Sequence, residues 1–275
     1  PSLQLIIALS LAFVSGFSAG ANAAKWQEIP SPGGDYKIGF SLSKSGHPLY
    51  RVIHHDEEII APSGLGFILD GEVAWTAGFQ TPGLSKRSAQ ESDWKPVWGE
   101  RSTVKDSFMA ATVTYPRQIA PGPFALEVRA YDQGVAFRYL IEKQGDVKEI
   151  RITSEETEFN FGKDHDLWAV YSAQGKYSKM KLSDLKHTVE RPCVLETGGG
   201  TVIAIAEAAM INFARMRLRP SSDKAHTLVS RLHSPVRSSL PMKTPWRVVM
   251  AGDRPGELLE NNDILLNLNE PNKIA

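Results

Sequence analysis

The sequence has 275 residues, with 31 basic and 31 acidic side chains and 42% hydrophobic residues. This composition is typical of a globular protein that has enough apolar residues to build a large core. The balanced charge and the lack of a strongly basic block argue against a nucleic-acid partner.

The first residues predict export. The apolar run "LQLIIALSLAFVSGF" has roughly the length of a signal-peptide hydrophobic region, and "ANA" at Ala21–Ala23 supplies a small-residue cleavage pattern before Lys25. Polar residues interrupt the run, so we expect a signal peptide over 1–23 rather than a membrane span, and no span in the mature chain. The chain begins with Pro1, so we expect its true start to precede this residue. We expect a periplasmic location, with secretion as the alternative.

Short segments rich in Val, Ile, Phe and Tyr follow, separated by Gly, Pro, Asp and Ser clusters, which is typical of strands and turns. The predicted strands are 36–42, 49–55, 65–70, 107–115, 124–131, 134–142, 149–153, 157–161, 167–171, 201–207, 226–232 and 245–251. We predict an all-β fold, a large two-sheet β-sandwich formed as one domain by residues 24–270. The polar stretches 81–93 and 219–226 are expected to be long surface loops.

Clusters of ionisable residues are interpreted as turns or solvated faces. His54 and His55 adjoin three acidic residues, but neighbours in a strand point to opposite faces, which favours a charged hairpin turn over a metal site. The "KDHDLW" stretch at 163–168 also has the composition of a turn. Arginines alternate at strand spacing in "RMRLR" at 215–219, which indicates one solvated face rather than a phosphate site.

One cysteine, Cys193, cannot form an internal disulfide, and we predict a buried core thiol rather than a nucleophile.

Glu207 is an ionisable residue in the otherwise apolar run "TVIAIAEAAMI" at 201–211. An unpaired carboxylate inside a covered strand is costly to desolvate, so Glu207 needs a partner. Three alternatives are open. The strand ends and Glu207 reaches water, a nearby arginine pairs with it, or it is a metal or substrate ligand.

Tryptophans next to polar residues are candidates for stacking on sugars, with packing in the core or at its rim as the alternative. These residues are Trp75, Trp94, Trp98, Trp168 and Trp246. The stretch "DWKPVWGERS" at 93–102 combines two of them with Glu100 and Arg101, which indicates either a loop of a carbohydrate groove or a buried ion pair.

Six strings in the same order resemble the N-terminal domain of glycoside hydrolase family 97. They are "WKPVWGERS", "VRAYDQGVAFRY", "EETEFNF", "IAEAAMINFARMRL", "TPWRVVMAGD" and "DILLNLNEPNKI". The resemblance implies a sandwich of galactose-mutarotase type, followed from a linker at 271–275 by a (β/α)₈ barrel that carries the catalytic carboxylates. No catalytic residue is then expected in this chain, which would be inactive alone.

The resemblance also implies an exo-acting, calcium-dependent α-glycosidase, either an α-glucosidase or an α-galactosidase, that hydrolyses oligosaccharides. Glu207 matches the position of a calcium ligand that the sandwich donates to the barrel. Apart from what the resemblance implies, Trp98, Glu100 and Arg101 are expected at the domain interface or at the substrate rim. The alternatives are a non-catalytic carbohydrate-binding module and an aldose mutarotase, which would need a histidine and a carboxylate converging in a groove.

Overall fold

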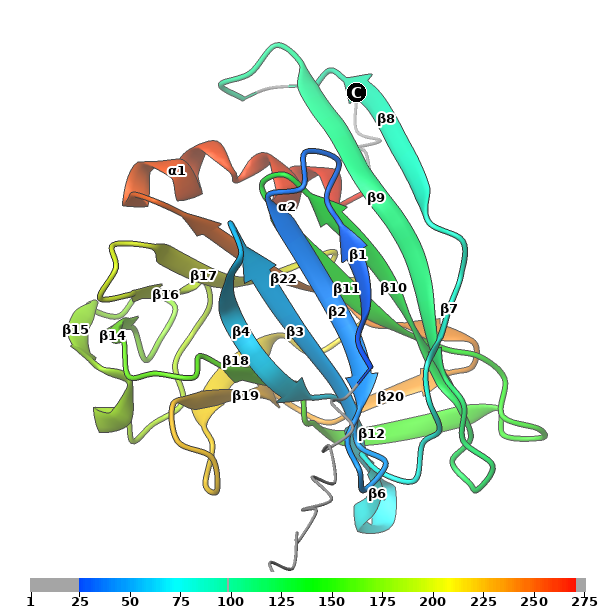
Figure 1. The fold of residues 1–275 in the computed structure, drawn as a ribbon. Coiled ribbons are helices and arrows are strands. Elements are labelled where there is room, and N and C mark those ends of the chain that lie inside the picture. Colours follow the sequence, from blue (N-terminus) through cyan, green and yellow to red (C-terminus); the bar gives the residue numbers. More distant parts are fainter. Residues whose placement is uncertain (1–24, 98, 271–275) are drawn as a thin grey trace, which may run out of the picture.

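The computed structural model describes residues 25–97 and 99–270 and is built almost entirely of antiparallel strands (Figure 1). The strands form two large sheets and one small sheet, so the predicted β-sandwich is confirmed. The predicted signal peptide (1–23) and the start of the linker (271–275) lie outside the described residues.

The first large sheet has the strand order β1-β2-β3-β4-β13-β19-β18. Its strands are β1 (Gln27–Pro30), β2 (Tyr36–Leu42), β3 (Pro48–His54), β4 (Glu57–Gly64), β13 (Glu158–Asn160), β18 (Met216–Pro220) and β19 (Thr227–Leu232). Buried and more exposed residues alternate along β3, as expected for a strand with one face on the core.

The second large sheet has the order β15-β14-β16-β17-β22-β11-β10-β9-β7, with β21 added to β11 and β8 added to β9. Its strands are β7 (Gly83–Leu84), β8 (Ser88–Trp94), β9 (Val104–Tyr115), β10 (Phe124–Tyr131), β11 (Gly134–Ile141), β14 (Asp166–Ala169), β15 (Ser178–Lys181), β16 (Cys193–Glu196), β17 (Val202–Ala208), β21 (Met242–Lys243) and β22 (Trp246–Gly252). Strands β17 and β22 are buried on both faces, which explains their nearly continuous apolar sequences.

The small sheet has the order β20-β12-β5-β6. Its strands are β5 (Phe67–Leu69), β6 (Val73–Trp75), β12 (Glu149–Glu155) and β20 (Val236–Ser239), and two 3₁₀ turns occur at η1 (Asp70–Glu72) and η2 (Leu182–Asp184). Glu155, the last residue of β12, is completely buried, so the end of this sheet reaches into the core.

The main core lies between the sheets and contains a cluster of aromatic rings around Phe124. The ring of Phe124 lies within 6 Å of the rings of Trp75, Phe79, Tyr115 and Tyr139. Such edge and tilted contacts add to the free energy gained by burying the rings.

A second, smaller core covers the outer face of the second large sheet. Two short helices, α1 (Pro255–Glu260) and α2 (Asp263–Asn267), lie over this face, and Ile264 and Leu268 are buried against it. Side chains alternate along β22, so Trp246 faces these helices while Arg247 points to the opposite, inner face. Within the described residues, no helix has the length and apolar character needed to cross a membrane.

The expectation of a loop over 81–93 is wrong. Strand β8 pairs with β9 from Ser88 to Trp94, and the two strands project as a hairpin beyond the sandwich (Figure 1). Every residue of β8 before Trp94 is exposed, so the strand lacks the apolar alternation by which half-buried strands are predicted. The other predicted loop is largely confirmed, because residues 221–226 join β18 to β19.

Candidate functional site

Glu207 lies on the inner face of β17, directly opposite Arg247 of β22. Arg247 donates to Glu207 Oε1, and Arg191 Nε donates to Oε2 at 2.9 Å. The backbone N–H of Met216 lies 3.2 and 3.1 Å from the two oxygens. Only 2% of the Glu207 side chain is exposed. Of the three alternatives for Glu207, the structure shows pairing with arginine.

The contacts of Glu207 are part of a longer buried charge network. Arg247 Nε and Nη2 donate to the two oxygens of Glu155, and both side chains are fully buried. Burial lowers the pKa of Arg247, but Glu155 and Glu207 more than offset this effect and hold the pKa above its usual range. The guanidinium therefore keeps its charge inside the core.

Glu190 continues the network toward the surface. Its carboxylate forms ion pairs with Arg215 and Arg217, with N···O distances of 3.2 and 3.1 Å. A third arginine, Arg191, has a nitrogen 3.5 Å from the same carboxylate. The strand spacing predicted for 215–219 is confirmed by β18, but these arginines are not simply solvated, because Arg219 also pairs with Glu156. The arginines instead compensate acidic residues that are partly or wholly buried.

Calcium takes six to eight oxygen ligands in proteins. At Glu207, the described residues supply one carboxylate, whose oxygens already accept contacts from two guanidinium groups and one backbone N–H. Among the described residues, no three His, Cys, Asp or Glu side chains are grouped so that they could hold a metal ion. The surroundings of Glu207 in this chain therefore do not fit calcium by themselves, and its role as a ligand stays a prediction.

The residues predicted at the substrate rim follow β8 in the sequence. Trp98 lies outside the described residues, and Glu100 is exposed. Arg101 forms an ion pair with Asp263 of α2 at 2.9 Å and donates to the carbonyl oxygen of Glu260. Arg101 therefore ties the hairpin loop to the helices, and its place at the substrate rim stays a prediction.

A hollow of about 520 Å³ lies between this hairpin and α2. It is lined by Ser92, Trp94, Pro96, Val97, Gly99, Asp106, Leu266, Asn267, Asn269 and Glu270. Asn267 accepts a hydrogen bond from Trp94 Nε1 and donates to the carbonyl oxygen of Lys105, both at 2.8 Å. Asp106 could not be singled out from the sequence, because nothing in "TVKDSF" distinguishes it from an exposed strand residue.

Asn269 connects this hollow to the strand that carries Glu207. Its Oδ1 accepts the N–H of Ala209, which follows β17, at 3.0 Å. The two regions selected from the sequence thus meet along the end of α2, although Glu207 points to the inner face and the hollow lies on the helix side.

The other tryptophans have different environments. Trp75 and Trp246 are buried, so core packing rather than sugar stacking accounts for them. Trp75 Nε1 donates to the carbonyl oxygen of Gly122. Trp168 is 37% exposed, donates to Glu196 and lies beneath Lys179, so it packs at the edge of the sheet.

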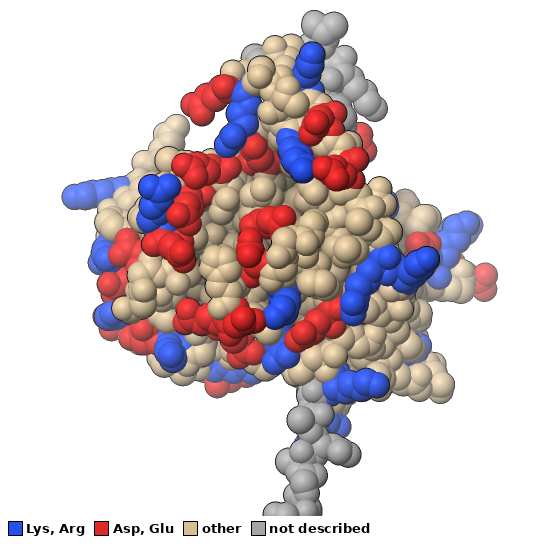
Figure 2. Space-filling model, turned by 45° about the horizontal axis from the view of Figure 1, so that its top comes forward, with Lys and Arg blue, Asp and Glu red and all other residues tan. Residues whose placement is uncertain are grey.

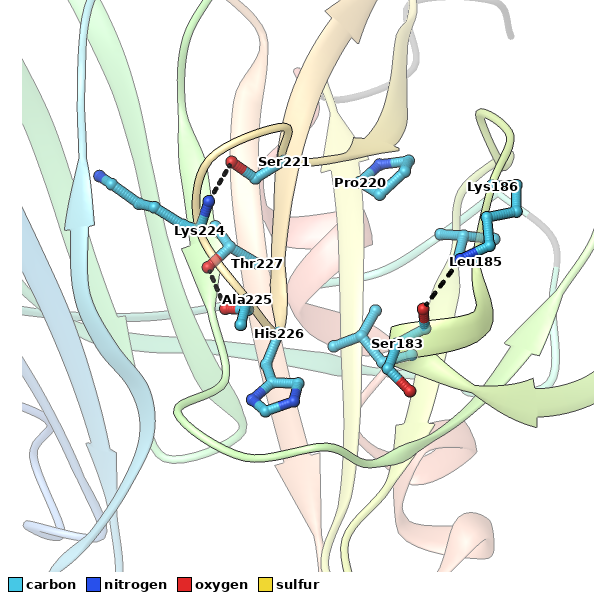
Figure 3. Close-up of a pocket in the computed structure, with 10 residues that line it drawn as sticks. Ser183, Leu185, Lys186, Pro220, Ser221, Lys224, Ala225, His226 and Thr227 are labelled. Atoms are coloured by element: carbon cyan, nitrogen blue, oxygen red, sulfur yellow. Dashed lines mark hydrogen bonds between the residues drawn. The ribbon is translucent and has the colours of Figure 1, made fainter.

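A hollow of about 800 Å³ is lined by His47 together with Glu156, Glu158 and Asp223. Other histidines, namely those of the β3–β4 turn and His226, do not provide the groove that a mutarotase needs. Residue His55 lies in the β3–β4 turn with a left-handed backbone, and its ring stacks on His54 at 4.0 Å instead of pointing to the opposite face. A hollow of about 400 Å³ is lined by His226 together with Ser183, Lys186 and Lys224 (Figure 3). None of the described residues that line it has a carboxylate, so no histidine–carboxylate pair converges there.

Cys193 is confirmed as a core thiol, because it is 1% exposed on β16. Burial raises the pKa of this thiol to about 12, so the reactive thiolate is scarce at neutral pH. We expect no labelling of the folded chain by a thiol reagent at pH 8, and one equivalent after unfolding in urea. Rapid labelling of the folded chain would contradict this assignment.

The end of the molecule that carries α1, α2 and the β8–β9 hairpin also exposes apolar side chains. Acidic and basic residues are interspersed around uncharged surface on this side (Figure 2). The exposed large apolar residues there are Val97, Met210, Ile211, Leu259 and Leu266. A surface of this kind, apolar and bordered by charges, is typical of protein contacts.

A family model described as "Glycosyl-hydrolase 97 N-terminal" matches residues 29–271. The chain belongs to glycoside hydrolase family 97. The resemblance found in the sequence is therefore confirmed, and so is the β-sandwich fold that it predicted.

Relatives within family 97 include characterised enzymes. The chain is 23% identical to a retaining α-galactosidase of Bacteroides thetaiotaomicron, over 90% of the chain and 37% of that protein. It is 30% identical to a family 97 enzyme of Pseudoalteromonas sp. strain K8 solved in complex with acarbose, with a TM-score of 0.82. That match covers 90% of the chain and 38% of the enzyme. A β-arabinopyranosidase shares the fold, with 18% identity and a TM-score of 0.74 over 83% of the chain and 40% of that protein.

Proposed function

We propose that the chain is the N-terminal domain of an exo-acting α-glycosidase that hydrolyses oligosaccharides. The family match over residues 29–271 carries this proposal. The relatives support it, because the chain spans two-fifths or less of each, and they include an α-galactosidase and an enzyme bound to acarbose. The alternatives for the substrate are an α-glucoside and an α-galactoside.

The exposed apolar side chains at the end of the molecule that carries α1 and α2 support the proposal that a second domain packs against this chain. Exposed Ile211 and Leu266 lie on either side of the end of α2, and the chain leaves the described structure beside them at Glu270. Burying such side chains against a second domain is favourable by about 25 cal/mol per Å². We propose a (β/α)₈ barrel as this partner, with the carboxylates that act as acid and as base or nucleophile.

Calcium belongs to the proposal for the complete enzyme, where it would support charge development at the sugar. Glu207 would become one of its ligands only if Arg191 or Arg247 released a carboxylate oxygen. We also propose a periplasmic location, which rests on the signal-like sequence before Lys25.

The decisive experiment is a hydrolysis assay of the full-length protein encoded at this locus, with p-nitrophenyl α-glucoside and p-nitrophenyl α-galactoside as substrates. We expect release of nitrophenol from one of them. Treatment with EGTA should slow this release, and added calcium should restore its rate. A full-length protein that binds oligosaccharides but cleaves neither substrate would favour the carbohydrate-binding module.

A further inference from the structure

Arg231 is an arginine without a partner on a sheet face that is already basic. It lies on β19 directly opposite Arg217 of β18, and Arg219 is the next residue of β18 on the same outer face. Arg231 is exposed and forms neither an ion pair nor a hydrogen bond with any of the described residues. Like charges directly opposite each other on neighbouring strands are destabilising, so this arrangement calls for an explanation.

The acidic residues that contact β18 do not compensate Arg231. Glu190 pairs with Arg217 and is shared with two further arginines. Glu156 pairs with Arg219, which uses only its Nη2 atom for this contact, at 3.0 Å. The side chain of Arg219 is 30% exposed. The guanidinium group of Arg231 and the remaining N–H groups of Arg219 are therefore available to an anion.

Arg219 and Arg231 meet in an open hollow of about 340 Å³. The other residues that line it are Thr153, Ser154, Leu232, His233, Ser234 and Pro235. None of the described residues in this lining has a carboxylate. His233 and Ser234 are exposed and add an imidazole and a hydroxyl group to the two guanidinium groups. Four groups that can donate hydrogen bonds thus surround one accessible space.

The chemistry of these groups selects the ligand. Two guanidinium groups repel a cation, and the described lining offers no aromatic ring of Phe, Tyr or Trp on which a neutral sugar could stack. Guanidinium groups bind carboxylate and phosphate oxygens through pairs of parallel hydrogen bonds. A phosphate has more oxygens than a carboxylate and carries nearly two charges at neutral pH, so it can bind both arginines at once.

We propose that the hollow between β12, β18 and β19 binds a phosphate group, either free or esterified, through Arg219 and Arg231. The alternating arginines at 215–219 do not indicate such a site by themselves, because only strand pairing brings Arg231 beside them. No described residue of α1, α2 or the β8–β9 hairpin lines the hollow, and β12 and β19 lie toward the other end of the molecule from these helices (Figure 1). The site is thus independent of the proposed hydrolase activity.

Calorimetric titration of the 275-residue chain at neutral pH tests this proposal. The probe is inorganic phosphate, and acetate and chloride at equal ionic strength serve as comparisons. We expect phosphate to bind most tightly, and Arg231→Gln to bind it at least about tenfold more weakly, because a charge-assisted contact is lost. The control is Arg87→Gln, which removes the same charge from an exposed arginine outside the hollow and should bind like the wild type.

Thermal unfolding gives a second measurement on the same variants. Phosphate should raise the melting temperature of the wild-type chain and of Arg87→Gln, because it binds the folded state, and should not raise that of Arg231→Gln. Without phosphate, Arg231→Gln should melt at or above the wild-type temperature, because it removes a like charge opposite Arg217. This expectation separates a binding role of Arg231 from a role in stabilising the fold.

Three results would overturn the proposal. They are equal binding of phosphate by Arg231→Gln and the wild type, equal binding of acetate or chloride and phosphate, and a lower melting temperature of Arg231→Gln without phosphate. Glucose 6-phosphate then distinguishes the two sources of the group. Tighter binding of this ester than of inorganic phosphate would assign the site to a phosphorylated molecule, and the reverse order would assign it to the free ion.

Discussion

Replacement of Arg247 by methionine is expected to lower the free energy of unfolding by about 3–5 kcal/mol, because it leaves two buried carboxylates without their shared partner. Arg247 and Glu155 have no exposed side-chain surface, and that of Glu207 is 2% exposed. Methionine is similar in size, so the cavity term is small and the loss reports mainly on charge. Urea unfolding followed by far-ultraviolet circular dichroism gives the difference.

The control for this variant is Arg237→Met. Arg237 pairs with Glu149 at 3.3 Å on the exposed edge of the small sheet, where 68% of its side chain is accessible. Exposed pairs of this kind contribute about 0–1 kcal/mol. Equal effects of the two substitutions would show that Arg247 is not the centre of the network. If Arg247→Met does not fold at all, Arg247→Lys, which keeps the charge but loses the paired geometry, should give a measurable intermediate value.

Trp246→Ala is expected to cost about 3–5 kcal/mol, the usual range when a large buried aromatic side chain is removed. Trp246 is 1% exposed and joins the outer face of β22 to the helices of the second core. The guanidinium groups of Arg138 and Arg129 lie 4.4 and 5.0 Å from its ring centroid. The variant therefore loses both apolar burial and the contact of two cations with the ring.

Trp168→Ala is the matched control, because the same side chain is removed at a position that is 37% exposed. Its cost should be clearly smaller, and the difference between the two variants measures burial rather than residue type. Similar losses for both variants in urea unfolding would contradict the assignment of Trp246 to the second core.

Most of the sandwich could be predicted because the side chains along its strands point alternately to the core and to the surface. The segment 36–42 and the segment 124–131 agree with β2 and β10 at both ends. Strand β8 was missed because both of its faces are exposed and its sequence is polar, so only pairing with β9 defines it. Such pairing is a tertiary contact that no local pattern reports.

The environment of Glu207 could be predicted only as a set of alternatives. The decisive fact is the register that sets Glu207 opposite Arg247, 40 positions further along the chain. A signal was present for one partner, since Arg247 is also a lone ionisable residue in an apolar strand. Glu155 gives no such signal, because it ends the largely polar strand β12. Predicting that Glu155, Glu207 and Arg247 meet requires knowing how two sheets pack together, which local sequence patterns do not reveal.

The hollow beside Asp106 could not be predicted, because its walls come from β8, β9 and α2, separated by about 160 positions. Trp94 and the loop after it could nevertheless be selected from the sequence, because tryptophan beside charged residues is typical of sugar contacts. The burial of one oxygen of the Asp106 carboxylate could not, because it is a property of packing.

The position of β22 has a consequence for the order of folding. It follows all other described strands along the chain, yet it pairs with β17 on one side and β11 on the other, in the middle of the sheet. While a ribosome is still making residues 246–252, both neighbours have unpaired edges, which are the usual starting points of aggregation. The contacts of β22 with β11 also close loops of more than 100 residues, which makes them slow to form. Completion of the sheet is thus delayed until nearly the whole described domain has been synthesised, and a protein of this design depends on being kept apart from its own copies until then.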